Sequence, residues 1–297
     1  MARLPELVER AVQRWGLTLG APFGVGTAAW TAPGTTGDGT PIVLKVVFPH
    51  DEAQHESTAL ALWHARAAVE LLASDPQDWA LLLRRAHPGT LLLHDGSPPE
   101  VRLAAALEVL RDLHRAPAAG SGLPLLSDVS AIWSRIATER ANRWARLYQP
   151  YRADVSYGLE LLSAFASPGV RPGPTVVLHG DFNPGNILLD APGKLTPQWL
   201  AIDPKPMLGD PAFDLWPLLS QVDHPFAHPD PVAVLAPRVE LASATLGIPF
   251  VRICEWAAAR TVESVLWQVE TWPEPARQAD ALADLAQARC WAQLARG

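Results

Sequence analysis

The chain has 297 residues, of which 48% are hydrophobic and 19% charged, and its formal net charge is −7 at pH 7. Two cysteines are too few for a disulfide framework or a cysteine-rich metal site, and the acidic balance argues against nucleic acid as the main partner. No apolar run approaches the roughly 20 residues that cross a bilayer, and charged residues interrupt the N-terminal segment where a signal peptide would stand. We therefore expect a cytoplasmic monomer with no membrane or nucleic-acid partner, and at about 150 residues per domain the length predicts two lobes.

The first third of the chain has the pattern of a small twisted sheet with one long helix. Apolar residues at helical spacing predict an amphipathic first helix, and the turn pair Asp38-Gly39 precedes a β-branched apolar run. The expected elements are a helix over 4–15, strand-like segments over 17–20 and 25–32, strands over 41–48 and 78–83, and a helix from 51 to about 72. We expect residues 1–86 to form a nucleotide-binding N-terminal lobe.

The remainder, residues 87–297, is expected to form a large helical lobe that contains the catalytic loop and the acceptor site. Helical segments are predicted over 101–115, 129–148, 153–165 and from about 213 onward, with short apolar strands at 176–178, 187–189 and 198–203 between them. A β-rich small lobe followed by a helical lobe with a strand-borne polar loop predicts an α+β, two-lobed protein-kinase-like fold.

The polar segment 179–186, His-Gly-Asp-Phe-Asn-Pro-Gly-Asn, joins two apolar runs and carries the strongest chemical signal. Asp181 and Asn186 lie five residues apart in this segment. Phosphoryl transfer uses a carboxylate that accepts the proton of the attacking hydroxyl, and an amide oxygen close by that holds Mg²⁺. Protein-kinase catalytic loops have the same spacing. A polar hairpin loop without catalytic function is the alternative.

Asp203 ends a short apolar run 17 residues after Asn186. A carboxylate at this place can bind the Mg²⁺ that bridges the nucleotide phosphates. A turn residue at a strand end is the alternative.

Lys45 is one of three lysines in the chain and stands in an otherwise apolar strand. A buried lysine lowers stability unless it is paired, and in kinases such a lysine holds the phosphates and pairs with a helix glutamate. Glu56 is the best partner on the following helix, and Glu52 is the second choice. The alternative is an edge-strand lysine with its amine in solvent.

The glycines and the remaining acidic residues give weaker signals. Gly24 and Gly26 suit a phosphate-binding loop, although Ala29 stands where a third glycine is expected. No Walker A motif is present, which excludes a P-loop route to the same chemistry. Asp214 is expected to support the catalytic loop together with His179, rather than to act in catalysis.

The chain resembles the aminoglycoside phosphotransferase family of kinase-like enzymes, and within it the streptomycin 6-phosphotransferases and hydroxyurea-type resistance kinases. The segments that carry the resemblance are WTAPGTTGDGTPIVLK, LHGDFNPGNILL and WLAIDPKPMLGDPAFDLWPLL. The resemblance implies Mg²⁺-assisted transfer of phosphate from ATP or GTP to a hydroxyl of a small molecule.

The resemblance also implies a role for individual residues. Asp181 would be the base, Asn186 and Asp203 would hold the metal, and Lys45 with Glu56 would fix the phosphates. Backbone groups from Arg84 to Ala86 would hold the adenine.

The chain departs from the family pattern at three places. Phe182-Asn183 stands where many relatives have Leu-His, Arg84 where many have Glu, and Asp203-Pro204-Lys205 where an Asp-x-Gly is common. These departures remove no catalytic group but leave the acceptor open.

The helical segment 250–271 offers a possible acceptor site. One face carries Trp256, Arg260, Glu263, Trp267 and Glu270. Acidic groups beside aromatic rings, here Glu263, Trp267 and Glu270, suit a cationic, guanidinium-bearing aminocyclitol. The alternative is that the tryptophans pack under a neighbouring helix while Glu263 pairs with Arg260.

Three functions are open at this stage. The first is phosphorylation of an aminoglycoside such as streptomycin, which inactivates the antibiotic. The second is a kinase for another acceptor, namely a sugar, a choline-like amine or hydroxyurea. The third is a pseudokinase or binding module, against which the complete set of Lys45, Asp181, Asn186 and Asp203 speaks.

Overall fold

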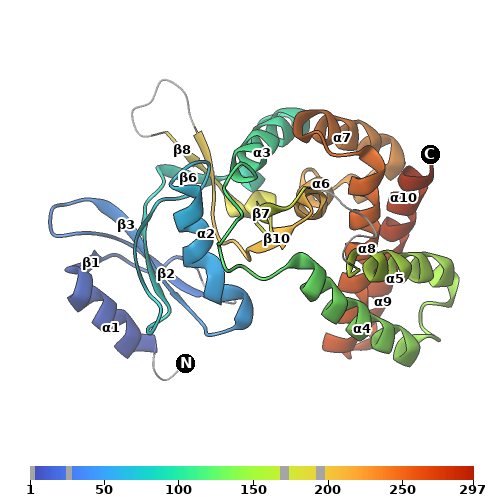
Figure 1. Cartoon of the computed structure of the whole chain (residues 1–297), viewed down its shortest axis with the longest axis horizontal. Coiled ribbons are helices and arrows are strands. Elements are labelled where there is room, and N and C mark those ends of the chain that lie inside the picture. Colours follow the sequence, from blue (N-terminus) through green and yellow to red (C-terminus); the bar gives the residue numbers. More distant parts are fainter. Residues whose placement is uncertain (1–3, 25–28, 168–173, 192–197) are drawn as a thin grey trace.

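A computed structural model of the chain describes residues 4–24, 29–167, 174–191 and 198–297. Its N-terminal part is an antiparallel five-stranded sheet in the order β1-β2-β3-β5-β4. Figure 1 shows this sheet with α1 on one side of the molecule and the helices α3 to α10 on the other. The elements of the N-terminal part are α1 (Leu4–Trp15), β1 (Thr18–Leu19), β2 (Ala29–Thr35), β3 (Pro41–Val47), α2 (Glu56–Trp63), β4 (Leu71–Asp75) and β5 (Ala80–Arg84).

The central strand β3 has different environments on its two faces. Ile42, Leu44 and Val46 are buried in a cluster with the apolar side of α1. Because side chains alternate along a strand, Lys45 points to the opposite face, toward α2. The sheet therefore buries an apolar face under α1 and presents a charged group on its other face.

The predicted helix from residue 51 to about 72 is wrong in its second half. A short 3₁₀ turn over Asp51–His55 precedes α2, which ends at Trp63. His64 adopts a left-handed conformation with φ of 47°, which stops the helix, and the chain then returns as β4 beside β5. The Ala- and Leu-rich composition gave no sign of this strand, because the hydrogen bonds of β5 decide its conformation.

The C-terminal part is mostly helical and contains two small sheets, β6-β8-β9 and β10-β7. The strands β6 and β10 were not predicted from the sequence, because they are short and stand in a Gly- and Pro-rich context. The strands are β6 (Pro88–Leu91), β7 (Val176–Leu178), β8 (Ile187–Asp190), β9 (Gln198–Ala201) and β10 (Met207–Gly209). The helices are α3 (Pro99–Leu113), α4 (Leu126–Trp144), α5 (Arg152–Phe165), α6 (Leu215–Gln221), α7 (Pro231–Leu246), α8 (Phe250–Thr271), α9 (Pro275–Ala283) and α10 (Leu285–Arg296).

The helix α8 is the centre of this helical part. It packs against α4, α5, α7 and α10, and most of its residues are buried. Within the described ranges, no individual helix has the length and hydropathy of a membrane span, and one bent pair, α7 with α8, has them by length and composition alone.

Backbone hydrogen bonds tie the two parts together beside the polar loop. Val69 N donates to Ala201 O at 3.0 Å, and Ala201 N donates to Ala67 O at 2.8 Å. These bonds fix the end of β9, and with it the segment that begins at Asp203, against the connection between α2 and β4. The boundary expected after residue 86 falls between β5 and β6 and stays a prediction.

Candidate active site

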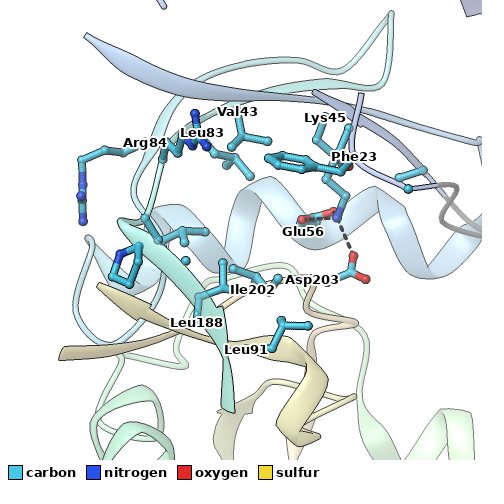
Figure 2. A pocket seen from close by; sticks show the side chains of 18 residues that line it. Phe23, Val43, Lys45, Glu56, Leu83, Arg84, Leu91, Leu188, Ile202 and Asp203 are labelled. Atoms are coloured by element: carbon cyan, nitrogen blue, oxygen red, sulfur yellow. Dashed lines mark hydrogen bonds and ion pairs between the residues drawn. The ribbon is translucent and has the colours of Figure 1, made fainter. Parts of the chain in front are cut away.

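A cavity of about 530 Å³ lies between the N-terminal sheet and the β8–β9 hairpin. Figure 2 shows Val43 and Leu83 on one wall and Leu188 and Ile202 on the opposite wall. Two apolar walls that face each other form a slot that suits a flat aromatic ring. Lys45 lies at the end of this slot away from Arg84 (Figure 2).

Lys45 makes two ion pairs in the cavity. Its Nζ lies 2.6 Å from Glu56 Oε1 and 2.5 Å from Asp203 Oδ1 (Figure 2). Burial alone would lower the pKa of Lys45, but the two carboxylates outweigh burial and raise it. For Asp203, burial acts to raise the pKa, but Lys45 holds it below its usual range. The cavity thus holds an ammonium and an ionised carboxylate in contact, and the predicted partner of Lys45, Glu56, is in place.

Asp203 has an unusual backbone conformation for a residue with a side chain. Its φ is 59°, in the left-handed region. Such conformations cost about 1–3 kcal/mol and persist where the surroundings enforce them, which is common at functional sites. The strain at Asp203 supports a function for its carboxylate beyond that of an ordinary turn.

The buried carboxylate of Asp214 holds the polar loop. It accepts hydrogen bonds from His179 N at 2.9 Å and from Gly180 N at 2.8 Å. His114 Nε2, from the end of α3, lies 3.0 Å from the same carboxylate. The sequence analysis did not identify His114, because the contact joins residues 100 apart in the chain.

His179 is fully buried and stabilises the loop from inside. Its Nε2 lies 3.0 Å from Ile202 O, and Asp181 N lies 3.3 Å from its Nδ1. Burial lowers the pKa of His179, which keeps the ring neutral near pH 7. A neutral ring with Nε2 protonated can make both hydrogen bonds, so His179 connects the loop to the segment that carries Asp203.

Gly180 allows the loop to approach that segment closely. Its φ is 83°, and a Cβ at this position would lie 1.9 Å from Lys205 O. A residue with a side chain therefore cannot replace Gly180 without moving the backbone.

Asn186 and Asp203 are the residues that could hold a metal ion. The Asn186 Nδ2 amide donates to Asp181 O at 2.9 Å, which leaves the amide oxygen as the atom for a metal. Asp203 adds a carboxylate that is half-exposed in the first cavity. Both are hard oxygen ligands of the kind that Mg²⁺ prefers, so these residues fit that ion.

A second cavity, of about 340 Å³, is lined in part by Gly180 and Asp181 of the polar loop. Asp181 and Lys205 form one end of it, and three aromatic side chains form another part of the wall, namely Trp133, Phe213 and Trp216. The Arg260 guanidinium lies over these rings at 4.2, 5.3 and 5.4 Å from their centroids. The base candidate Asp181 therefore faces a pocket with aromatic walls and a cation.

The structure places the other predicted nucleotide-site residues at the first cavity. Gly24, Arg84 and Ala86 line it, and Gly26 lies outside the described residues. The Arg84 side chain pairs with buried Asp190, Nη2 to Oδ2 at 2.9 Å. This pair connects the end of β5 to the β8 strand.

The predicted acceptor residues on α8 have protein partners. Glu263 Oε2 accepts from Arg260 Nη1 at 2.7 Å. Both carboxylate oxygens of Glu270 pair with arginines of α4, and the exposed Trp267 packs edge-on against Trp272. Glu263 therefore contacts Arg260, which lines the second cavity. Neither Trp267 nor Glu270 is among the side chains that line this cavity.

Comparison with known proteins agrees with this geometry. The model of the aminoglycoside/hydroxyurea antibiotic resistance kinase family matches residues 20–271. A streptomycin 6-kinase from Streptomyces glaucescens is 34% identical over 91% of this chain and 84% of the relative. A hydroxyurea phosphotransferase from Kitasatospora aureofaciens is 32% identical over 90% of this chain and 74% of the relative.

The fold has a match among solved structures. The GDP complex of aminoglycoside 2'-phosphotransferase-IIIa aligns with a TM-score of 0.66 and 14% identity, covering 96% of this chain and 97% of that one. This match confirms the predicted two-lobed, protein-kinase-like fold. The chain is thus a phosphotransferase that belongs to the aminoglycoside/hydroxyurea antibiotic resistance kinase family.

Proposed function

We propose that this enzyme transfers the γ-phosphate of ATP or GTP to a hydroxyl group of an aminoglycoside, and that streptomycin is its acceptor. The observation that carries the proposal is that the segment 202–205 contributes residues to both cavities and is hydrogen-bonded to the loop 179–186. Lys45 and Asp203 line the cavity with the flat apolar slot, and Asp181 lines the cavity with the aromatic wall. A nucleotide in the first cavity and an acceptor in the second would meet at this loop.

In this arrangement each residue has a distinct task. Lys45, held by Glu56, binds the nucleotide phosphates, and Asp181 orients the acceptor hydroxyl and accepts its proton. Asn186 and Asp203 would hold Mg²⁺, which supplies positive charge to the phosphates. Because little covalent chemistry falls to the protein, positioning and charge account for most of the rate.

The second candidate acceptor is hydroxyurea, which the similarity to a hydroxyurea phosphotransferase favours at an identity close to that of the streptomycin kinase. Sugars and choline-like amines are further candidate acceptors, which the same assay can test. The expectation of a monomeric cytoplasmic enzyme stays a prediction.

The test measures the rate at which ADP or GDP forms from ATP or GTP in the presence of each candidate acceptor. The panel of acceptors contains streptomycin, hydroxyurea, choline and hexoses. We expect streptomycin to stimulate release strongly with Mg²⁺ present, and EDTA to abolish the stimulation. Stimulation by hydroxyurea alone would replace the proposed acceptor. Stimulation by no member of the panel would contradict the proposal.

Arg260 is expected to contact the acceptor. The guanidinium lines the second cavity and has more N–H donors than Glu263 accepts. We expect Arg260→Met to raise the KM of the acceptor at least about tenfold, because a hydrogen bond from a charged group to an acceptor oxygen contributes roughly 1.5–3 kcal/mol. In the same variant, the KM of the nucleotide should change by less than about twofold.

Arg289→Met is the matched control for this prediction. Arg289 also pairs with an acid, Asp154, and lies over a ring, Tyr151, but it lines neither cavity. Steady-state kinetics with both substrates varied should show normal KM values for this variant. An equal rise of both KM values in Arg260→Met would contradict a contact with the acceptor. The direct acceptor contacts predicted for Trp267 and Glu270 stay predictions.

A further inference from the structure

Lys205 is fixed to the catalytic loop by its backbone. Its N donates to His179 O at 2.8 Å, and its carbonyl oxygen lies against Gly180 so closely that no side chain fits there. Lys205 also follows Asp203 by two residues, so the same short segment carries Asp203 and is hydrogen-bonded to the loop that carries Asp181. A residue held on both sides in this way has a defined position relative to Asp181.

The side chain of Lys205 extends to the acceptor side of the loop. Its Nζ lies 3.3 Å from Asp181 Oδ2, and the side chain is 43% exposed and lines the second cavity. Lys45 lines the first cavity at the end away from Arg84, where it contacts Asp203. The two lysines therefore line different cavities, Lys45 the first and Lys205 the second.

Phosphoryl transfer needs positive charge on the acceptor side of the transferred group. The transition state spreads negative charge over the equatorial oxygens of the transferred group, and fixed cations stabilise it. The loop 179–186 contains no lysine or arginine of its own. Lys205 supplies an ammonium to the same place from the neighbouring segment.

We propose that Lys205 is a catalytic residue that contacts the transferred phosphoryl group. This inference rests on the proposed function, in that it takes Asp181 as the base. The acceptor oxygen forms a bond to the γ-phosphorus, the bond from that phosphorus to the bridging oxygen of the β-phosphate breaks, and the hydroxyl proton goes to Asp181. Lys205 keeps its protons throughout and supplies charge and hydrogen bonds to the phosphoryl oxygens.

We expect the Lys205 side chain to add little to the stability of the fold. A partly exposed ion pair contributes about 0–1 kcal/mol to stability, and the contacts that fix Lys205 to the loop are made by its backbone. Neutral variants should therefore fold and bind nucleotide, which allows the catalytic effect to be measured separately.

The experiment compares Lys205→Met, Lys205→Gln and Lys205→Arg with the unmodified enzyme. For the two neutral variants we expect kcat to fall about 10²-fold, as for removal of one preorganised donor to transition-state charge. The nucleotide Kd should stay within about twofold, and Lys205→Arg should recover part of the loss because the charge is retained. A kcat of the neutral variants within about threefold of the unmodified enzyme would overturn the proposal.

A second arm separates catalysis from positioning of Asp181. Lys205→Met is combined with Asp181→Asn, and single turnovers are followed with labelled nucleotide and excess enzyme. If Lys205 contacts the phosphoryl group, its loss lowers the residual rate in the Asp181→Asn background as well. If its loss has no effect in that background, Lys205 only positions Asp181 and the proposal is wrong.

A third readout distinguishes this inference from the proposed acceptor. Slow hydrolysis of the nucleotide, with water as acceptor, uses the same phosphoryl transfer without any antibiotic. If no acceptor of the panel is phosphorylated, the proposed function fails, and the effect of Lys205→Met on hydrolysis still decides the role of Lys205. If Lys205→Met leaves both the rate of hydrolysis and the rate of transfer unchanged, the proposed role of Lys205 is wrong.

Discussion

Replacing Asp181 by asparagine should lower kcat for acceptor phosphorylation by about 10²–10⁴-fold, the range over which a general base contributes. Asparagine has the same shape and can accept the hydrogen bond that Asn183 Nδ2 donates to Oδ1 of Asp181 at 3.0 Å. It cannot accept a proton from the attacking hydroxyl. The variant should therefore keep its fold and its nucleotide affinity while it loses transfer.

The control for this experiment is the nucleotide. Binding of ADP or GDP with Mg²⁺, followed by calorimetry, should give the same Kd in the variant and the unmodified enzyme, since Asp181 lines the second cavity and not the first. Transfer that stays within tenfold of the unmodified rate would rule out Asp181 as the base.

Loss of the Lys45 ammonium should have the second large effect. We expect Lys45→Met to lower kcat/KM for the nucleotide about 10²–10³-fold, because the charge that faces the phosphates is gone. The same change leaves the Glu56 carboxylate, which is only 3% exposed, buried without its partner. Removing one member of a buried pair costs about 3–5 kcal/mol of stability.

The double variant Lys45→Met/Glu56→Gln separates stability from catalysis. Without an unpaired buried carboxylate, its free energy of unfolding should recover most of the loss, while its activity stays as low as that of Lys45→Met. Urea unfolding and initial rates measure the two quantities. Recovery of activity together with stability would show that Lys45 acts only as part of the fold.

The local patterns of the sequence predicted two contacts in the candidate site, one around Lys45 and one within the loop 179–186. A lysine in an apolar strand and a glutamate on the next helix have a strong physical reason to pair, and the structure places Lys45 and Glu56 in contact. The spacing within 179–186 similarly placed Asp181 and Asn186 in one loop, with a hydrogen bond between them. Their chemical roles remain predictions until the variants are measured.

The lining of the second cavity could not be predicted in the same way. Its wall combines Trp133 from α4 and Trp216 from α6 with Arg260 from α8, and only tertiary packing brings these helices together. Helical periodicity identifies a face of α8 but not the element that this face meets. The pairing of Glu263 with Arg260 was one of two open alternatives, and the structure contains that pair.

Tertiary contacts also explain why the helix predicted from residue 51 to about 72 is wrong in its second half. The segment 64–75 has a helical composition. Its last residues nevertheless form the edge strand β4, because their backbone can hydrogen-bond to β5. Local propensity is a weak guide where a neighbouring strand provides such partners. His114 is a further example, since nothing near it in the sequence indicates its contact with Asp214.

The most direct test of the whole account is a crystal structure with Mg²⁺ and a non-hydrolysable analogue of ATP or GTP. The account predicts the base in the slot between Val43 and Ile202, the phosphates at Lys45, Mg²⁺ on Asp203, and the terminal phosphate facing Asp181. A triphosphate bound away from Lys45 and Asp203, or a terminal phosphate that points away from Asp181, would contradict it.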